Sequence, residues 1–438
     1  MIKLKEEITM KANLNPNLLK ARKNGDYLDP DGSITENTGR HGRRNNNTLV
    51  VGSAGSGKTN GKCIEEILSG AGGGSMIISD AKGELYERCA PILEKNGYRT
   101  MMMDTIYLKR GIHYNAILGL DTPNDVQKMS HILVYLGLDR SRIRDPFWPQ
   151  AEEMQANCAL GYFMEGGRGF EKSFYGLNRL LATFDADALA NGKPCDAAKV
   201  FEAHRAEYKK RTGQESWAYE QFKKFVGLSE RTFSTVQVSL YGDLMPFDTP
   251  EMREMTRYSD FDIKSLAEEK TALFINISDT DRSKDKFINI FYTQVMDTLC
   301  RYADSLPDKY LPVPVRFLLD DFGSSAKIEG FENMISNIRS RGISVLLLLQ
   351  SIAQLEQSYG IGAKTILANC NTKIYMGGSD LDTADYFSKL TNKPIEKLIN
   401  MPMMTHWLVR QGEQPRFGKT LLIDSYELDN DRLNDREI

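Results

Sequence analysis

The segment that most constrains this fold is a glycine-rich stretch that directly follows a run of apolar residues. Its residues are Gly52, Ser53, Ala54, Gly55, Ser56, Gly57, Lys58 and Thr59. They match the pattern G-x-x-x-x-G-K-[ST], in which glycines let backbone N–H groups converge on phosphate oxygens. The pattern needs a strand before it and a helix after it, and the sequence predicts both, over Thr48–Gly52 and Lys58–Leu68. We therefore expect a phosphate-binding loop within an α/β fold.

Two residues of this loop have side chains suited to a nucleotide with its metal ion. We expect the Lys58 ammonium to reach the β- and γ-phosphates and the Thr59 hydroxyl to hold Mg²⁺. The positive N-terminal end of the following helix adds to the attraction for phosphate. The sequence therefore predicts a chain that binds ATP or a related nucleotide with Mg²⁺, and that hydrolyses it.

A second strand candidate, Val315–Leu319, ends in two carboxylates. We expect Asp320 to lie on the Mg²⁺ side and Asp321 to orient or deprotonate the attacking water. An acid pair at a strand end can instead cap the next helix. Asp80, at the end of the strand candidate Ser75–Ser79, stays open as an alternative acid.

Polar residues also flank the strand candidate Ile343–Leu349. Gln350 follows it, which places the amide at the carboxyl edge of a parallel sheet, where it could sense the γ-phosphate. Arg339 and Arg341 precede the strand at a helix end. Either arginine could act on transition-state charge in a neighbouring subunit, or could simply favour a helix C-terminus through the helix dipole. Spacing alone does not separate these alternatives.

The remaining pattern alternates apolar runs with helical segments and lacks clean polar alternation, as in parallel strands buried on both faces. The further strands expected are Arg99–Met103, Thr271–Ile277, Thr372–Met376 and His406–Arg410. This order predicts a doubly wound α/β fold with a helix expected over Glu84–Lys95.

The middle of the chain carries helical patterns and no convincing strand. The helices expected there are Gln150–Met164, Phe174–Ala188, Ala197–Arg211 and Gln221–Leu244. We interpret residues 145–247 as an inserted all-α domain between two parts of a nucleotide-binding domain, 46–144 and 248–438, with a polar N-terminal arm over 1–45. The alternative is that these helices only cover the sheet.

Composition excludes several classes of protein. Hydrophobic residues are 41% and charged residues 26% of the 438, so a disordered or fibrous chain is excluded. The net charge of -3 favours neither nucleic acid nor an acidic membrane, so a DNA-binding surface would have to be local. The basic run Lys209–Arg211 is one such candidate, although a charge run is more often a solvated helix face. The sequence shows no signal peptide and no apolar run long enough to cross a membrane.

Several segments together resemble one family, the coupling ATPases of type IV secretion and conjugation systems of the VirD/TraG/TraD type. The segments are NTLVVGSAGSGKT, SDAKGELYE at Ser79–Glu87, DPFW at Asp145–Trp148, the run Phe317–Leu355, and the run Ala363–Lys389. The resemblance implies a RecA-like P-loop nucleotide-binding domain with an inserted all-α domain. It also implies a hexameric motor, at the cytoplasmic base of a secretion channel, that couples ATP turnover to the transfer of a relaxase–DNA complex or of protein substrates.

The resemblance extends to individual residues. By position in the motifs, Lys58 and Thr59 match the phosphate-loop residues, Asp320 the Mg²⁺-side acid, and Gln350 the glutamine sensor. Arg339 matches the finger arginine, which decides between it and Arg341.

Two departures from the family pattern limit this inference. The family has Asp-Glu where this chain has Asp320-Asp321, and the shorter carboxylate predicts slower turnover. Family members mostly carry N-terminal transmembrane helices, so we expect membrane contact only through a partner or through an anchor outside this sequence. A nucleotide-binding substrate adaptor with little turnover, and an FtsK-type DNA pump, are the alternative functions.

Overall fold

A computed structural model describes residues 27–28, 34–35, 45–68, 73–136, 145–323 and 327–420 of the chain. The polar arm expected over 1–45 therefore lies mostly outside the described residues. Within it, only the short antiparallel pair β1 (Tyr27–Leu28) and β2 (Ile34–Thr35) and residue 45 are described. Among the described residues, no helix combines the length and the apolar character that a membrane crossing requires.

The centre of the fold is a nine-stranded sheet with the strand order β11-β10-β9-β3-β8-β7-β4-β6-β5. The strands are β3 (Thr48–Val51), β4 (Ser75–Asp80), β5 (Arg99–Asp104), β6 (Thr271–Asn276), β7 (Val315–Leu319), β8 (Ile343–Leu349), β9 (Thr372–Tyr375), β10 (Thr405–Arg410) and β11 (Arg416–Lys419). Neighbours from β9 to β5 pair in parallel. The carboxyl ends of these strands therefore meet at one edge of the sheet.

Every strand expected from the sequence is present, but two features of the sheet were not predicted. β10 runs antiparallel to β9, and β11, which is mostly exposed, pairs antiparallel with β10. The sheet is thus mixed at this edge rather than purely parallel. β11 escaped prediction because its sequence, RFGK, has no apolar run to mark a buried strand.

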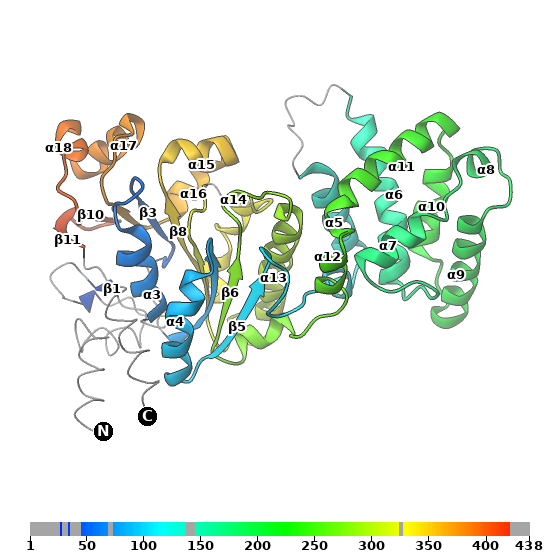
Figure 1. The fold of residues 1–438 in the computed structure, drawn as a ribbon, viewed down its shortest axis with the longest axis horizontal. Coiled ribbons are helices and arrows are strands. Elements are labelled where there is room, and N and C mark those ends of the chain that lie inside the picture. The colour runs from blue at the N-terminus through cyan, green and yellow to red at the C-terminus, as the bar shows by residue number, and fades with distance from the viewer. Residues whose placement is uncertain are drawn as a thin grey trace. The chain divides into compact units, whose positions relative to one another are not determined.

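By contacts within the chain, the described residues form two compact units. The sheet unit holds the described residues up to Gly111, Asp262–Arg282, and the described residues from Val295 on. Its helices are α3 (Ile64–Leu68), α4 (Glu84–Lys95), α14 (Phe331–Met334), α15 (Ile352–Tyr359), α16 (Gly362–Asn369), α17 (Leu381–Thr391) and α18 (Ile395–Ile399). α3 packs on α4, and Figure 1 shows both in blue beside the strands.

The core of the sheet unit explains why these segments form these elements. Ile64 of α3 and Leu93 of α4 lie in one buried cluster with Ile78 of β4, Phe274 of β6 and Leu348 of β8. Each is no more than 1% exposed. Burying a side chain of this size contributes about 1.5–3 kcal/mol relative to leaving it in water. The face covered by α3 and α4 is therefore fixed, and the loop that joins β3 to α3 is held at the carboxyl edge.

The helical unit holds the described residues of Ile112–Phe261 together with Ser283–Gln294. Its helices are α5 (Pro123–Tyr135), α6 (Phe147–Met164), α7 (Phe174–Leu181), α8 (Ala186–Ala190), α9 (Asp196–Thr212), α10 (Trp217–Val226), α11 (Glu230–Leu244) and α12 (Pro250–Met255). α13 (Asp285–Ser305) begins in this unit and ends in the sheet unit. Between β5 and β6, the described residues contain no strand longer than a single bridge residue.

Two helices expected as single segments are each broken in two. The expected Gln221–Leu244 is divided between α10 and α11, because Ser229 caps a new helix by accepting the Thr232 amide. The expected Phe174–Ala188 is divided between α7 and α8, where Asp185 accepts the Ala188 amide. Ser and Asp compete for backbone N–H groups in this way and so favour helix starts over interiors.

Candidate functional site

The glycine-rich loop lies where the sequence predicted it, between β3 and the helical turn that leads into α3. Its first amides are bonded to neighbouring strand ends: Gly52 N–H donates to Leu349 O at 3.1 Å and Ser53 N–H to Gly377 O at 3.0 Å. Gly55 and Gly57 have φ values of 77° and 86°, which side chains other than glycine rarely adopt. The two glycines thus let the loop curl above the sheet edge, as a phosphate cradle requires.

Lys58 points back over this loop. Its Nζ donates to Gly52 O at 2.6 Å and to Ser53 O at 3.0 Å, and the residue is only 7% exposed. Burial lowers the pKa of the Lys58 ammonium, and the charges of Asp321 and Asp320 oppose that shift. A partly desolvated cation held at the mouth of the loop is suited to meet a phosphate anion.

Thr59 and Asp320 are brought together although 261 positions separate them in the sequence. The Thr59 hydroxyl donates to Asp320 Oδ2 at 2.9 Å. Ser79 fixes the same acid from the next strand, since its hydroxyl donates to Asp320 O at 3.1 Å. Burial and the neighbouring Asp321 raise the pKa of the Asp320 carboxyl to about 6. A buried carboxylate beside a hydroxyl, with no cationic side chain bonded to it by any described contact, has the oxygen chemistry of a Mg²⁺ site.

Gln350 and Asp321 also meet at this edge. β8 lies between β3 and β7 in the sheet, so the residue after β8 falls between the loop and the acid pair. Gln350 Nε2 is 3.5 Å from Asp321 Oδ1, at the outer limit of a hydrogen bond. Asp321 has a φ of 49°, in the left-handed region, where Asp is tolerated better than most residues.

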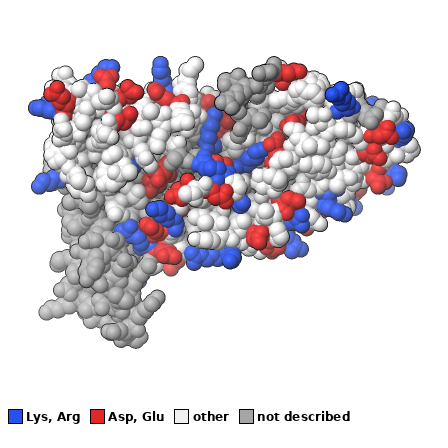
Figure 2. Space-filling view, turned by 45° about the horizontal axis from the view of Figure 1, so that its top comes forward, with Lys and Arg blue, Asp and Glu red and all other residues white. Residues whose placement is uncertain are grey.

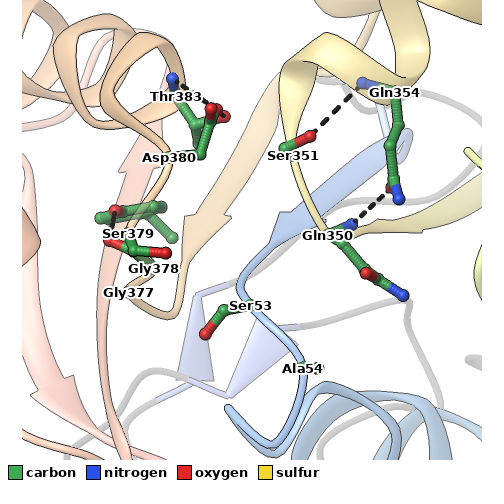
Figure 3. Close-up of a pocket in the computed structure, with 11 residues that line it drawn as sticks. Ser53, Ala54, Gln350, Ser351, Gln354, Gly377, Gly378, Ser379, Asp380 and Thr383 are labelled. Carbon is green, nitrogen blue, oxygen red and sulfur yellow. Dashed lines mark hydrogen bonds between the residues drawn. The ribbon is translucent and has the colours of Figure 1, made fainter.

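A pocket opens beside the loop, between the ends of β3, β8 and β9 (Figure 3). Its lining consists of Ser53, Ala54, Gln350, Ser351, Gln354, Tyr375, Gly377, Gly378, Ser379, Asp380 and Thr383. The stretch after β9 was not predicted as part of the site. Its Gly-Gly pair was the available signal, and Gly377 has a φ of 83° and accepts the Ser53 amide at 3.0 Å. The loop and this stretch are in close contact.

Arg339 lies at the opposite edge of the sheet from the loop. It is an exposed residue of the 3-10 turn Ile338–Arg341, which precedes β8, whereas Gln350 follows the same strand. The length of β8 separates the two by roughly 20 Å. Arg341, in the same turn, forms a two-pronged pair with Asp304 at 2.8 and 2.9 Å. Within one chain, therefore, neither arginine joins the other candidate residues.

Asp80, the alternative acid, is used locally. It is 1% exposed, and its Oδ2 accepts the Tyr86 amide at 2.9 Å, so it holds the first turn of α4. Burial raises the pKa of its carboxyl, opposed by backbone hydrogen bonds from Tyr86, Leu85, Lys82 and Gly83. This favours Asp320 over Asp80 as the metal-side acid.

The basic run of the helical unit also has local partners. Lys209 pairs with Glu215, and Arg211 donates to the Glu165 carbonyl. Figure 2 shows Lys and Arg interspersed with Asp and Glu over the described residues of the face in view. These contacts favour the interpretation of Lys209–Arg211 as a solvated helix face.

Comparison with known proteins gives matches in sequence and in fold. A family model described as type IV secretory system conjugative DNA transfer matches residues 3–394. Protein VirD4 of Rhizobium radiobacter is 25% identical over 354 residues, covering 78% of this chain and 47% of that protein. Protein VirD4 of Agrobacterium fabrum is 25% identical over 350 residues, covering 78% and 49%. The chain thus spans about half the length of the curated relatives it matches.

Among solved structures, the unbound conjugative coupling protein TrwB has a TM-score of 0.63 at 18% identity and covers 94% of this chain and 92% of that one. TrwB in complex with ADP and Mg²⁺ has a TM-score of 0.59 at 19% identity, with 86% and 85% covered. VirB4 of Thermoanaerobacter pseudethanolicus has a TM-score of 0.56 at 14% identity, with 91% and 96% covered. Likeness at these identities concerns the fold, and it confirms the RecA-like P-loop architecture expected from the sequence.

Proposed function

Because this chain belongs to the type IV secretory system conjugative DNA transfer family, we propose that it is an ATP-driven coupling protein. It recruits relaxase–DNA or protein substrates and promotes their transfer through a type IV secretion channel. The single observation that carries the ATP-driven part is the contact of 2.9 Å between Thr59 Oγ1 and Asp320 Oδ2, beside the glycine-rich loop. That TrwB, a fold relative, is described with ADP and Mg²⁺ supports the proposal.

The residues present fit a nucleotide with Mg²⁺. The backbone of Gly52–Thr59 would surround the phosphates, with Lys58 as the cation against the β- and γ-phosphates. The Thr59 hydroxyl and the Asp320 carboxylate would hold Mg²⁺, which when bound neutralises charge on the phosphate oxygens. Asp320 must lose its proton to do so. The burial and the neighbouring Asp321 charge that raise its pKa also favour a cation beside the ionised carboxylate.

Asp321 and Gln350 would complete the chemistry on the γ-phosphate side. The Asp321 carboxylate would orient the attacking water and accept its proton, and the Gln350 amide would report whether the γ-phosphate is present. Their contact at 3.5 Å links the two roles, since a ligand that draws Gln350 away also frees Asp321 Oδ1 for a water.

Arg339 would serve the site of a second copy of the chain. Its place at the far edge of the sheet prevents it from acting on its own loop, so a finger role requires a ring, which we propose is a homo-hexamer. We place this ring at the cytoplasmic face of the bacterial membrane. We further propose that residues 145–247 act as an inserted all-α domain that receives substrates, between the nucleotide-binding parts 46–144 and 248–438, with 1–45 as a polar arm.

An ATPase assay with and without single- or double-stranded DNA tests the proposal. We expect turnover in wild type that rises with DNA, and a loss of at least about 100-fold in Lys58→Ala, since a preorganised cation is removed from developing charge. Lys62→Ala is the matched control, because Lys62 sits on the same turn and pairs with Glu65 at 3.3 Å. Full activity in Lys58→Ala would refute the proposal.

A second function, a nucleotide-binding adaptor with little turnover, is favoured by one observation: Asp321 stands where the family pattern has Glu. The same assay separates the two functions. Tight ATP binding without turnover, at every protein and DNA concentration tried, would favour the adaptor.

A further inference from the structure

The turn that follows the glycine-rich loop is not an ordinary α-helical turn. Residues Thr59–Cys63 are π-helical, and the Ile64 N–H donates to Thr59 O, five residues back. π-turns are rare, are less favourable than α-helical turns, and are found often at functional sites. Here the first residue of the turn is Thr59, the residue that contacts Asp320. The position of the Thr59 hydroxyl therefore depends on what holds this turn from outside.

One side chain from the neighbouring helix does so. Arg88, on α4, donates from Nη1 to Asn60 Oδ1 at 2.9 Å, and Asn60 directly follows Thr59. The Nε and Nη2 atoms of Arg88 are buried and have no hydrogen-bond acceptor among the described residues. Burying guanidinium donors without acceptors lowers stability. A chain departs from the rules of stability in this way mainly at functional sites.

Two residues at the end of β4 contact the elements on either side of the proposed Mg²⁺ site. Asp80 fixes the start of α4 by accepting the Tyr86 amide, and Ser79 donates to the carbonyl of Asp320. α4 then presents Arg88 to Asn60, and the Thr59 hydroxyl returns to Asp320. The contacts form a closed path around the proposed Mg²⁺ site, in which the Arg88–Asn60 hydrogen bond joins α4 to the π-turn.

We propose that Arg88 is a positioning residue that, through Asn60, fixes the π-turn and thereby the Thr59 hydroxyl toward Mg²⁺. The inference rests on the proposed function, since it assigns Thr59 to the metal bound with the nucleotide. A guanidinium suits this position better than an ammonium, because it is more weakly hydrated and its planar shape loses less freedom in holding an acceptor.

The test compares ATP binding in Mg²⁺ with ATP binding in EDTA. In Arg88→Ala we expect the apparent Mg²⁺ affinity, measured by titrating Mg²⁺ into protein with saturating ATP, to fall about tenfold, as for other residues that orient a metal ligand. Binding in EDTA should stay within about twofold, because the loop and Lys58 are unchanged. Asn60→Ala should have the same effect, and the double variant should be no worse than either single variant, because the two act through one contact.

Hydrogen exchange gives a readout that does not depend on ATP. The Gly61–Ile64 amides should exchange faster in Arg88→Ala and in Asn60→Ala than in wild type, because the π-turn loses its outside contact. Arg110→Ala is the matched control: this arginine lies in the sheet unit, its side chain is 61% exposed, and its nearest acid is Glu87 on α4 at 3.8 Å. It should change neither readout.

Wild-type Mg²⁺ affinity and exchange rates in both Arg88→Ala and Asn60→Ala would overturn the inference while leaving the proposed function intact. Equal losses of binding in Mg²⁺ and in EDTA would also overturn it, because they indicate a general disturbance of the loop. A wild-type chain that does not bind ATP would refute the proposed function, and the inference with it.

Discussion

Buried charged side chains at the two ends of the sheet differ in how they are paired. At the amino end, Arg316 of β7 is paired with Glu66 of α3 at 2.9 Å, with both side chains no more than 8% exposed. Its guanidinium also donates to Asn46 O at 2.8 Å and to the Ser344 hydroxyl at 3.1 Å. At the carboxyl end, Asp320 lies buried beside a second acid, and the Lys58 ammonium is bonded to carbonyls rather than to a carboxylate. One end compensates each charge within the chain, and the other leaves charge for a ligand to compensate.

The largest expected effect concerns Arg339 and Arg341, in the turn at the amino end of β8. If Arg339 acts on a neighbouring site, Arg339→Ala should lower kcat about 10³-fold, whereas Arg341→Ala should change it less than about twofold. Arg341 is ion-paired with Asp304. This pair is partly exposed, so it contributes about 0–1 kcal/mol to stability. ATPase rates of both variants, measured at concentrations where rings form, check this.

Mixing variants sharpens the same test. Arg339→Ala and Lys58→Ala subunits are each inactive alone under this hypothesis, but a mixed ring contains interfaces with an intact loop and an intact arginine. Partial recovery of ATPase activity on mixing is the expected result. No recovery, or a normal rate for Arg339→Ala alone, would contradict a role across the subunit interface.

The next effect is on stability and not on the site. Arg316→Ala should lower the free energy of unfolding by about 3–5 kcal/mol, since it leaves Glu66 buried without its partner. Urea unfolding monitored by circular dichroism measures the loss. The double replacement Arg316→Met with Glu66→Leu should recover most of it, because apolar residues of similar volume replace the pair. A small loss in Arg316→Ala would mean that the amino end is not the compensated end.

Asp320→Asn should have the reverse effect at the carboxyl end. In the metal-free protein at pH 8 it should raise the free energy of unfolding by on the order of 1–3 kcal/mol, because an ionised, buried carboxylate becomes neutral. The pKa of about 6 in the folded protein lies above the ordinary value of 3.8 for an aspartate. The destabilisation that comes from ionising Asp320 therefore reaches its full value above pH 6, and the advantage of the variant should fade between pH 6 and 4.

Thermal unfolding across this pH range checks the prediction, and Mg²⁺-dependent ATP binding should be lost in the same variant. Lower stability of Asp320→Asn at pH 8 would show that the carboxylate is already compensated within the chain. Asp80→Asn is an informative comparison. Burial raises the pKa of that acid too, but the asparagine NH2 group cannot accept the backbone N–H donors around it, so its replacement should gain less stability than Asp320→Asn.

The sequence predicted those parts of the site that depend on local order along the chain. The strand before Gly52 and the acids after Leu319 followed from apolar runs that end in polar residues. The order β3-β8-β7 was not available from the sequence, so the contact of Gln350 with Asp321 and the bond from Ser79 to Asp320 could not be derived. The placement of Arg339 was derivable, since it precedes a parallel strand whose far end meets the loop.

The local helix geometry and the contacts between helices could not be predicted from the sequence. A π-turn depends on a single extra residue in the hydrogen-bond pattern, and the sequence Thr59–Cys63 is equally compatible with an α-helix. The pairing of Arg88 with Asn60 follows only once α3 and α4 are packed side by side. For the same reason, the sequence could not tell that the two basic residues Lys209 and Arg211 have partners in their own unit.

The smallest expected effect tests how far the carboxyl end is adjusted for turnover. Asp321→Glu extends the second carboxylate by one methylene, and we expect kcat to rise about tenfold if reach toward the water limits the rate, with ATP affinity unchanged. The residue has a φ of 49°, which Glu adopts less readily than Asp, so part of the gain should be lost to backbone strain.

Single-turnover ATP hydrolysis separates the chemical step from product release. Asp321→Asn is the control, since it keeps the short side chain and removes the base, and it should lower the rate. A glutamate variant as slow as wild type in the single turnover would show that the distance to the water is not limiting, and that the carboxyl end of this sheet is built to hold nucleotide more than to hydrolyse it.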